Sequence, residues 1–284
     1  MKNVFACIDG SKAAEAVCDA AAWASQRVDR QLVLLHVLDK SVYPTKTDMS
    51  GNLKLGTREH LLDELAELDA KRSKLALEAG KEQLKAAVER VKAQGIETPE
   101  TRQRHGHFVE TLAELQEETR ILVLGRQGED HDNPEEIGGN LESVIRSLSC
   151  RILIIPPGFS QPEKVLLAYD GSATAKKVLY IMARSPLCKG LPFHLLFVGE
   201  DSEKNRQLLE GAKQEMEQEG HREVVTAIRS GEVEETLLAY REEEQLDLII
   251  MGAYGHSRIR QFLVGSTTTN LLRKSPVPIL LMRQ

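Results

Sequence analysis

The stretch from Gly252 to Asn270 reads GAYGHSRIRQFLVGSTTTN and decides the fold of its half of the chain. Gly252 and Gly255 are separated by two residues, and nine further residues lead to Gly265. The apolar run 246–251 that precedes them predicts a buried strand ending at glycine. Glycines permit close backbone approach and positive φ, and hydroxyl residues follow where a helix would begin. A strand, a glycine loop and a helix N-terminus in this order are typical of a phosphate site.

The chain carries this unit twice. The apolar run that ends at Asp9 realigns with the run that ends at Asp170, an offset of 161 residues. The strand that ends at Gly125 realigns with the strand that ends at Gly252, an offset of 127 residues. Self-similarity of this kind indicates tandem domains. We predict repeats at residues 1–157 and 163–284, with the boundary in a proline-rich stretch.

Each repeat reads as five short strands alternating with helices. This pattern predicts an α/β fold of two tandem, doubly wound, parallel five-stranded sheets, with the ligand crevice at the carboxyl ends of the strands. The last strands, 151–155 and 277–282, are apolar and would each leave an unpaired sheet edge. We expect them to pair across a pseudo-twofold axis, which leaves a further homodimer of whole chains open.

The spacing of Gly252, Gly255, Gly265 and Ser266 resembles the G-x2-G-x9-G-[S/T] pattern of nucleotide-binding universal stress proteins. The resemblance implies a Rossmann-like fold of the adenine-nucleotide alpha-hydrolase type. It also implies ATP or another adenine nucleotide as the ligand, with Mg²⁺ as an optional companion. Because the family dimerises through its last strand, one tandem chain resembles one dimer.

The resemblance also assigns the site in the second repeat. Adenine and ribose are expected against Asp170 and Val198, at the ends of the first and second strands of that repeat. The phosphates are expected at the glycine loop and the start of the next helix, which comprise Gly252, Gly255, Gly265, Ser266 and Thr267. His256 lies inside the loop, where it would either donate to a phosphate or simply occupy the surface.

The two glycine loops differ in charge. From Gly252 to Lys274 there are four basic residues and no acidic one, a local balance of +4. From Gly125 to Arg146 two basic residues face six acidic ones, a balance of −4. Gly139 also stands where the second repeat has its first hydroxyl residue, although Asn140 offers a helix cap. Carboxylates near phosphates oppose binding, so we expect nucleotide in the second repeat only.

The first repeat holds 34 extra residues, which fall in the segment of about 41–94. Leucines spaced among charged residues predict one or two long amphipathic helices there. Such helices would lie on the sheet, roof an apolar pocket, or dock a partner.

Composition narrows the class of protein. The chain is 41% hydrophobic and has no apolar run of membrane-spanning length, which favours a soluble protein without a membrane span. A strand beginning almost at Met1 leaves no room for a signal peptide, so we expect a cytoplasmic protein. The net charge of −6 argues against nucleic acid as a partner. Four unpaired cysteines favour neither disulfides nor zinc.

Three further features of the sequence could indicate a metal site or a catalytic group. His105 and His107 flank a glycine, but no third ligand is identifiable nearby, so we expect a structural turn and no metal site. Asp170 could orient a water, but no nucleophile–base pair or P-loop lysine accompanies it. Ser11 and Ser172 are expected to cap helices. We therefore predict no catalytic residue and no enzyme.

Three hypotheses follow. The first is a regulatory protein of the stress response that binds ATP in its second repeat and changes its affinity for a regulatory partner protein that the sequence does not identify. The second is a regulatory scaffold without nucleotide. The third is a binder of an amphiphilic metabolite in the first repeat, under the helices of the segment 41–94.

Overall fold

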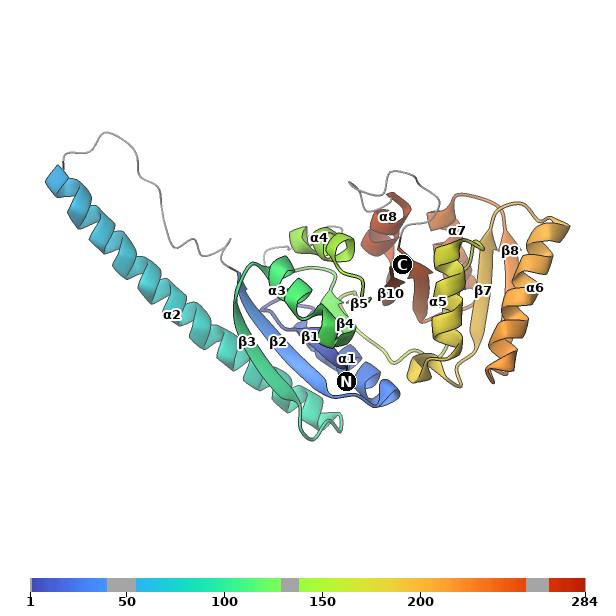
Figure 1. Cartoon of the computed structure of the whole chain (residues 1–284), viewed down its shortest axis with the longest axis horizontal. Helices are drawn as coiled ribbons and strands as arrows, with labels where there is room; N and C mark the ends of the chain where they lie inside the picture. The colour runs from blue at the N-terminus through green and yellow to red at the C-terminus, as the bar shows by residue number, and fades with distance from the viewer. Residues whose placement is uncertain (1, 40–54, 129–137, 254–265, 284) are drawn as a thin grey trace.

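The computed structural model of the chain describes residues 2–39, 55–128, 138–253 and 266–283. Within these ranges the strands form a continuous sheet that carries helices on both faces (Figure 1). No helix in the described ranges is both long and apolar enough to cross a membrane.

The first half of the chain alternates strands and helices, as predicted. Its elements are β1 (Asn3–Cys7), α1 (Ala14–Val28), β2 (Leu32–Asp39), α2 (Leu55–Ala93), β3 (Glu100–Gly106), α3 (Phe108–Glu114), η1 (Gln116–Glu118), β4 (Thr119–Gly125), α4 (Gly139–Ser147) and β5 (Arg151–Ile155).

The second half repeats this order without the long helix. Its elements are β6 (Val165–Ala168), α5 (Ala173–Ala183), η2 (Pro186–Cys188), β7 (Phe193–Val198), α6 (Glu203–Gln218), β8 (Val224–Arg229), α7 (Val233–Glu243), β9 (Leu248–Gly252), α8 (Ser266–Lys274) and β10 (Ile279–Met282).

The strand order is β3-β2-β1-β4-β5-β10-β9-β6-β7-β8. Within each half the neighbouring strands are parallel, whereas β5 and β10 pair antiparallel, with Leu153 opposite Leu280. The predicted pairing of the last strands is therefore confirmed. It joins the two five-stranded halves into a ten-stranded sheet and covers two apolar edges.

Two hydrophobic cores lie on opposite faces of the sheet. Successive residues of β1 alternate between them, since Val4 and Ala6 belong to one core and Phe5 to the other. Helices α1, α2, α5 and α6 cover the first core, and α3, α4, α7 and α8 cover the second. Burial on both faces explains why the central strands are apolar runs rather than alternating sequences, whereas the edge strand β3 is polar and has no buried residue.

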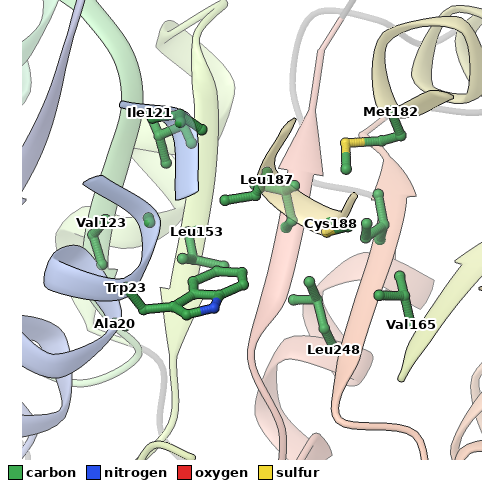
Figure 2. Packing of buried hydrophobic residues seen from close by; sticks show 14 of the residues in the cluster. Ala20, Trp23, Ile121, Val123, Leu153, Val165, Met182, Leu187, Cys188 and Leu248 are labelled. Atoms are coloured by element: carbon green, nitrogen blue, oxygen red, sulfur yellow. The ribbon is translucent and has the colours of Figure 1, made fainter. Parts of the chain in front are cut away.

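Side chains from both halves meet around Trp23 of α1. Figure 2 shows Trp23 and Leu153 on one side of this contact and Leu187 and Leu248 on the other. The Trp23 ring also lies 6.1 Å from the ring of Phe159, in the connection between β5 and β6. The first core is thus continuous across the two repeats.

The inserted segment forms one long helix in its described part. The C-terminal part of α2 packs on α1 and β2, where Leu84, Ala87 and Val91 are buried. Arg90 fixes this contact because its Nε and Nη2 donate to the two carboxylate oxygens of Asp19, each over 2.7 Å.

The predicted helix caps are confirmed in one case and wrong in two. The Ser172 hydroxyl accepts a hydrogen bond from the backbone N–H of Ala175 at 3.1 Å. Ser11 does not cap α1, because that helix begins at Ala14 with Ala13 in the cap position and has no side-chain cap. Asn140 does not cap α4 either, because the helix already begins at Gly139 and Gly138 occupies the cap position.

Candidate functional site

The second repeat has a topological switch point between β6 and β9. The chain leaves β6 for β7 on one side, whereas β9 pairs with β6 on the other side. Crossover connections that diverge in this way leave a crevice at the carboxyl ends of the strands. Of the predicted site residues, Val198 ends β7 and Gly252 ends β9, both at this edge of the sheet.

Asp170 lies at the same edge, two residues beyond the end of β6, with an exposed side chain. Its Oδ1 accepts a hydrogen bond from the backbone N–H of Ser172 at 3.0 Å. Asp9 makes the same contact with Ser11 in the first repeat, also at 3.0 Å. Both aspartates therefore stabilise the turn into the next helix.

Glycine is needed at position 252 because it has no side chain, not because of an unusual backbone conformation. We expected positive φ as a use for this glycine, but it is part of β9 and is absent from the described residues with positive φ. A Cβ atom at Gly252 would lie 2.5 Å from Cγ2 of Thr174 on α5. The glycine is required because α5 crosses β9 at this point.

The phosphate end of the site is described only in part. Gly255, His256 and Gly265 lie outside the described residues. Ser266 and Thr267 are the first two residues of α8, as predicted, and the first turn of α8 contains no acidic residue. The N-terminal N–H groups of this helix have no partner within the helix and carry its positive dipole end.

The four basic residues between Gly252 and Lys274 do not all lie near the proposed phosphate end of the site. Arg273 and Lys274 lie in the last turn of α8, about 12 Å along the helix from Ser266. Lys274 Nζ is 2.7 Å from Oε1 of Glu234, and this carboxylate raises the pKa of Lys274. Two of the four predicted cations therefore do not face the phosphate end, because the helix carries them away from it.

The first repeat contains a cavity of about 570 Å³ at the equivalent edge of the sheet. Its floor consists of the carboxyl ends of β1, β2 and β4, and its far wall is the start of α4. Helix α2 contributes lining residues that include Arg72, Ala76 and Gln83. The inserted helix therefore both lies on the sheet, through its C-terminal part, and lines a pocket beside it, as two of the alternatives predicted.

Gly80 lets α2 approach β2. A Cβ atom there would lie 2.4 Å from Cε1 of His36. Gln103 of β3 secures the helix, because its Nε2 donates to the carbonyl oxygen of Leu77 over 3.2 Å. Burial lowers the pKa of His36, so the imidazole beside the helix is neutral. The sequence signal for this contact was a single glycine inside a helical pattern.

The charged side chains that line the cavity are two acidic residues, Asp9 and Asp39, and one basic residue, Arg72. Asp9 and Asp39 lie on its floor, and Asn140 and Gln127 lie near the degenerate glycine loop. One carboxylate oxygen of Asp39 is already engaged, because Oδ2 accepts a hydrogen bond from the backbone N–H of Phe108 at 3.3 Å. Such a lining can hold hydroxyl or amine groups next to apolar surface, but it disfavours a polyphosphate.

The His105–His107 segment connects β3 to α3, since His105 and Gly106 end the strand and His107 is the residue before the helix. Gly106, between the histidines, ends β3 with φ of 154°, and its counterpart Gly231 has φ of 142°. Among the described residues, no group of three or more histidine, cysteine or acidic side chains could hold a metal ion.

Arg126 connects the first glycine loop to the helix of the second site, and sequence reasoning missed it. It is buried, and its Nη1 donates to the carbonyl oxygens of Leu272 and Ser275, at the C-terminal end of α8. No sequence pattern reveals this contact, because the two partners are about 150 residues apart.

This architecture, with its crevice at the switch point of a parallel sheet, defines a Rossmann-type α/β protein. The chain belongs to the universal stress protein family, which matches residues 1–156 and 162–283. It is 34% identical over 288 residues to universal stress protein Slr1230 of Synechocystis sp., with 100% of both chains covered.

Two further comparisons agree. A universal stress protein of Methanocaldococcus jannaschii is 32% identical over 83 residues, which are 29% of this chain and 51% of that protein. The crystal structure of a universal stress protein from Archaeoglobus fulgidus superposes with a TM-score of 0.73 at 24% identity. It covers 99% of this chain and 98% of that chain, which shows a shared tandem fold.

Proposed function

We propose that this protein is a stress-response regulator that binds ATP, or another adenine nucleotide, in its C-terminal repeat. The observation that supports this most directly is the position of α8. The helix begins at Ser266, immediately after the last glycine of the motif and at the carboxyl edge of the sheet. A helix N-terminus without acidic residues in its first turn favours a bound phosphate.

In this proposal the phosphates lie at Gly255, Gly265, Ser266 and Thr267, with Mg²⁺ as an optional companion. Gly252 keeps the loop close to α5, and His256 donates to a phosphate oxygen. Adenine and ribose lie against Asp170 and Val198 at the neighbouring strand ends.

The bound nucleotide acts as a signal rather than a substrate. We propose that its occupancy alters the affinity of the chain for a regulatory protein partner in the cytoplasm. We take residues 1–157 and 163–284 as the two repeats, of which the first contributes the scaffold and a separate cavity.

Isothermal titration calorimetry with MgATP tests the nucleotide proposal. We expect one nucleotide per chain, and we expect Gly265→Val to abolish binding because the side chain fills phosphate space. The matched control is Gly139→Val, at a site in the first repeat where an added Cβ meets no atom within 4 Å. Two equivalent sites, or unchanged affinity in Gly265→Val, would show that the site is misplaced.

The cavity in the first repeat favours a second function. We propose that it binds an amphiphilic metabolite, because its volume of about 570 Å³ is that of a small-molecule pocket and its lining combines apolar side chains with the charged residues Asp9, Asp39 and Arg72. A thermal-shift screen of lipid-like and amine-bearing compounds tests this idea. A hit should disappear in Ala76→Trp, which fills the cavity from the roof, while MgATP binding stays unchanged.

A further inference from the structure

The N-terminal half of α2 stands clear of the rest of the molecule (Figure 1). The helix has 39 residues, so it is about 58 Å long, but its buried contacts are concentrated near its C-terminal end. Leu68, in this half, is 60% exposed, and Leu75, near the middle of the helix, is 66% exposed. They are among five large hydrophobic side chains that are exposed in the described residues.

These leucines cannot reach the body of their own chain by any rotation of the helix. Leu75 and the buried Leu84 are nine residues apart, which at about 100° per residue places them on opposite faces of α2. A helix that buries Leu84 against β2 and α1 must therefore present Leu75 to the outside.

The exposed leucines belong to a regular pattern. Positions 61, 65, 68, 72, 75 and 79 are spaced by four and three residues in alternation, and four of the six are leucine. This is the heptad spacing of a helix that packs against a second helix. Arg72 and Ala79 of this stripe also line the cavity of the first repeat. Most of the stability of such a helix comes from packing of its apolar face, and the described body of the chain covers neither Leu68 nor Leu75.

We propose that the projecting half of α2 pairs with the same segment of a second copy of this chain, in antiparallel orientation. A spacing of four, three, four, three and four residues reads the same in both directions. A twofold axis across the helix therefore brings the stripe onto itself, as a symmetric dimer interface requires.

Charge selects the antiparallel arrangement. The segment 59–69 carries five acidic residues and no lysine or arginine, whereas the segment 71–74 carries three basic residues. In an antiparallel pair, Glu64 at the edge of the acidic segment flanks Lys71 at the edge of the basic segment of the second copy. Parallel helices would instead put like charges side by side.

A register follows from the same charges. When position 65 of one copy lies level with position 68 of the other, Glu64 of the first copy flanks Lys71 of the second. The twofold axis then also places Lys71 of the first copy beside Glu64 of the second. This register overlaps residues 55–78 of each helix, so the two bodies lie at opposite ends of the pair. The ion pairs favour the antiparallel orientation of the two helices, and burial of the leucines contributes most of the binding free energy.

The test measures the mass of the full chain by sedimentation velocity over a concentration series. We expect a dimer of the wild-type chain, and association at least about a hundredfold weaker in Leu68→Glu/Leu75→Glu. The matched control is Val233→Glu, at an exposed apolar side chain on α7, which should remain dimeric. Circular dichroism and melting temperature establish that each variant is folded.

Charge reversal tests the orientation. Glu64→Lys or Lys71→Glu alone should weaken the dimer, and the double variant Glu64→Lys/Lys71→Glu should restore it. In a parallel pair Glu64 would flank Asp69 of the second copy, so strengthening by Glu64→Lys would overturn the antiparallel proposal. A wild-type chain that stays monomeric, or a dimer that survives Leu68→Glu/Leu75→Glu, would overturn the docking surface itself. Nucleotide binding is a separate measurement and does not depend on either result.

Discussion

The Nη1 atom of Arg126 donates a hydrogen bond to the carbonyl oxygen of Ser275 over 2.8 Å. The same nitrogen lies 3.1 Å from the carbonyl oxygen of Arg273. These oxygens end α8, so a cation of the first repeat stabilises the negative end of the helix whose positive end opens the proposed nucleotide site. The two repeats are therefore linked by more than the β5–β10 pairing.

Replacing Arg126 with alanine should destabilise the protein and weaken nucleotide binding together. The change leaves C-terminal carbonyl groups of α8 without their charged donor, at a cost of about 2–4 kcal/mol in the free energy of unfolding. Because α8 also carries Ser266, MgATP affinity should fall. Urea denaturation and calorimetry measure the two effects. Arg146→Ala, an exposed arginine on α4, is the control, and equal losses in both variants would contradict a specific link.

Gly80→Ala should destabilise the protein although alanine is the better helix former. Helix propensity alone would favour alanine by about 1 kcal/mol. Here the added methyl group would lie 2.4 Å from Cε1 of His36, so we expect a net loss of about 1–2 kcal/mol. Gly211→Ala is the matched control, because an added Cβ on α6 meets nothing within 4 Å and should stabilise by about 0.5–1 kcal/mol. A more stable Gly80→Ala variant would disprove the close approach of α2 to β2.

Sequence periodicity and repeat alignment were sufficient to predict the ten strands, their parallel halves and the pairing of β5 with β10. These features depend on apolar runs and on the need to cover sheet edges, both of which are local properties of the sequence. The roles of His36 and Arg126 were not predictable, because each depends on contacts between distant segments, and the glycine at position 80 indicated a close approach without naming its partner. The distribution of charge around α8 was misjudged for the same reason. A residue count does not reveal that Lys274 is at the far end of the helix beside Glu234.

The protein should lose stability as the pH falls from about 7 to 5.5. Burial lowers the pKa of His36, His194 and His221 in the folded state. The unfolded chain, with histidine pKa near 6.5, therefore binds more protons than the folded chain below that pH. Each histidine can contribute up to about 1.4 kcal/mol per pH unit. Urea denaturation at several pH values should show a shallower slope for His36→Phe, which copies Phe197 of the second repeat. An unchanged slope would mean that His36 titrates normally.

The acidic loop of the first repeat should be convertible toward nucleotide binding. Neutralising Asp130, Asp132, Glu135 and Glu136, which lie outside the described residues, removes the charges that oppose phosphate. Gly139→Ser adds the missing hydroxyl at a position with open space around its Cβ. Calorimetry of the combined variant should show a second, weaker MgATP site. If only one site remains, the α2 roof over the cavity excludes the nucleotide sterically, which strengthens the proposal of a different ligand there.

The protein should hydrolyse ATP slowly or not at all. Binding a triphosphate needs backbone donors, a helix N-terminus and nearby positive charge, which our proposal assigns to the glycine motif and the start of α8. Rapid hydrolysis needs in addition an oriented water and stabilisation of the charge that develops in the transition state. Asp170 is the available orienting group, but its Oδ1 already accepts from the backbone of Ser172, and Arg273 and Lys274 lie at the other end of α8. A phosphate-release assay under multiple-turnover conditions should give a rate near the uncatalysed background, equal in wild type and Asp170→Asn. Robust turnover that disappears in Asp170→Asn, with MgATP binding retained, would make this protein an enzyme.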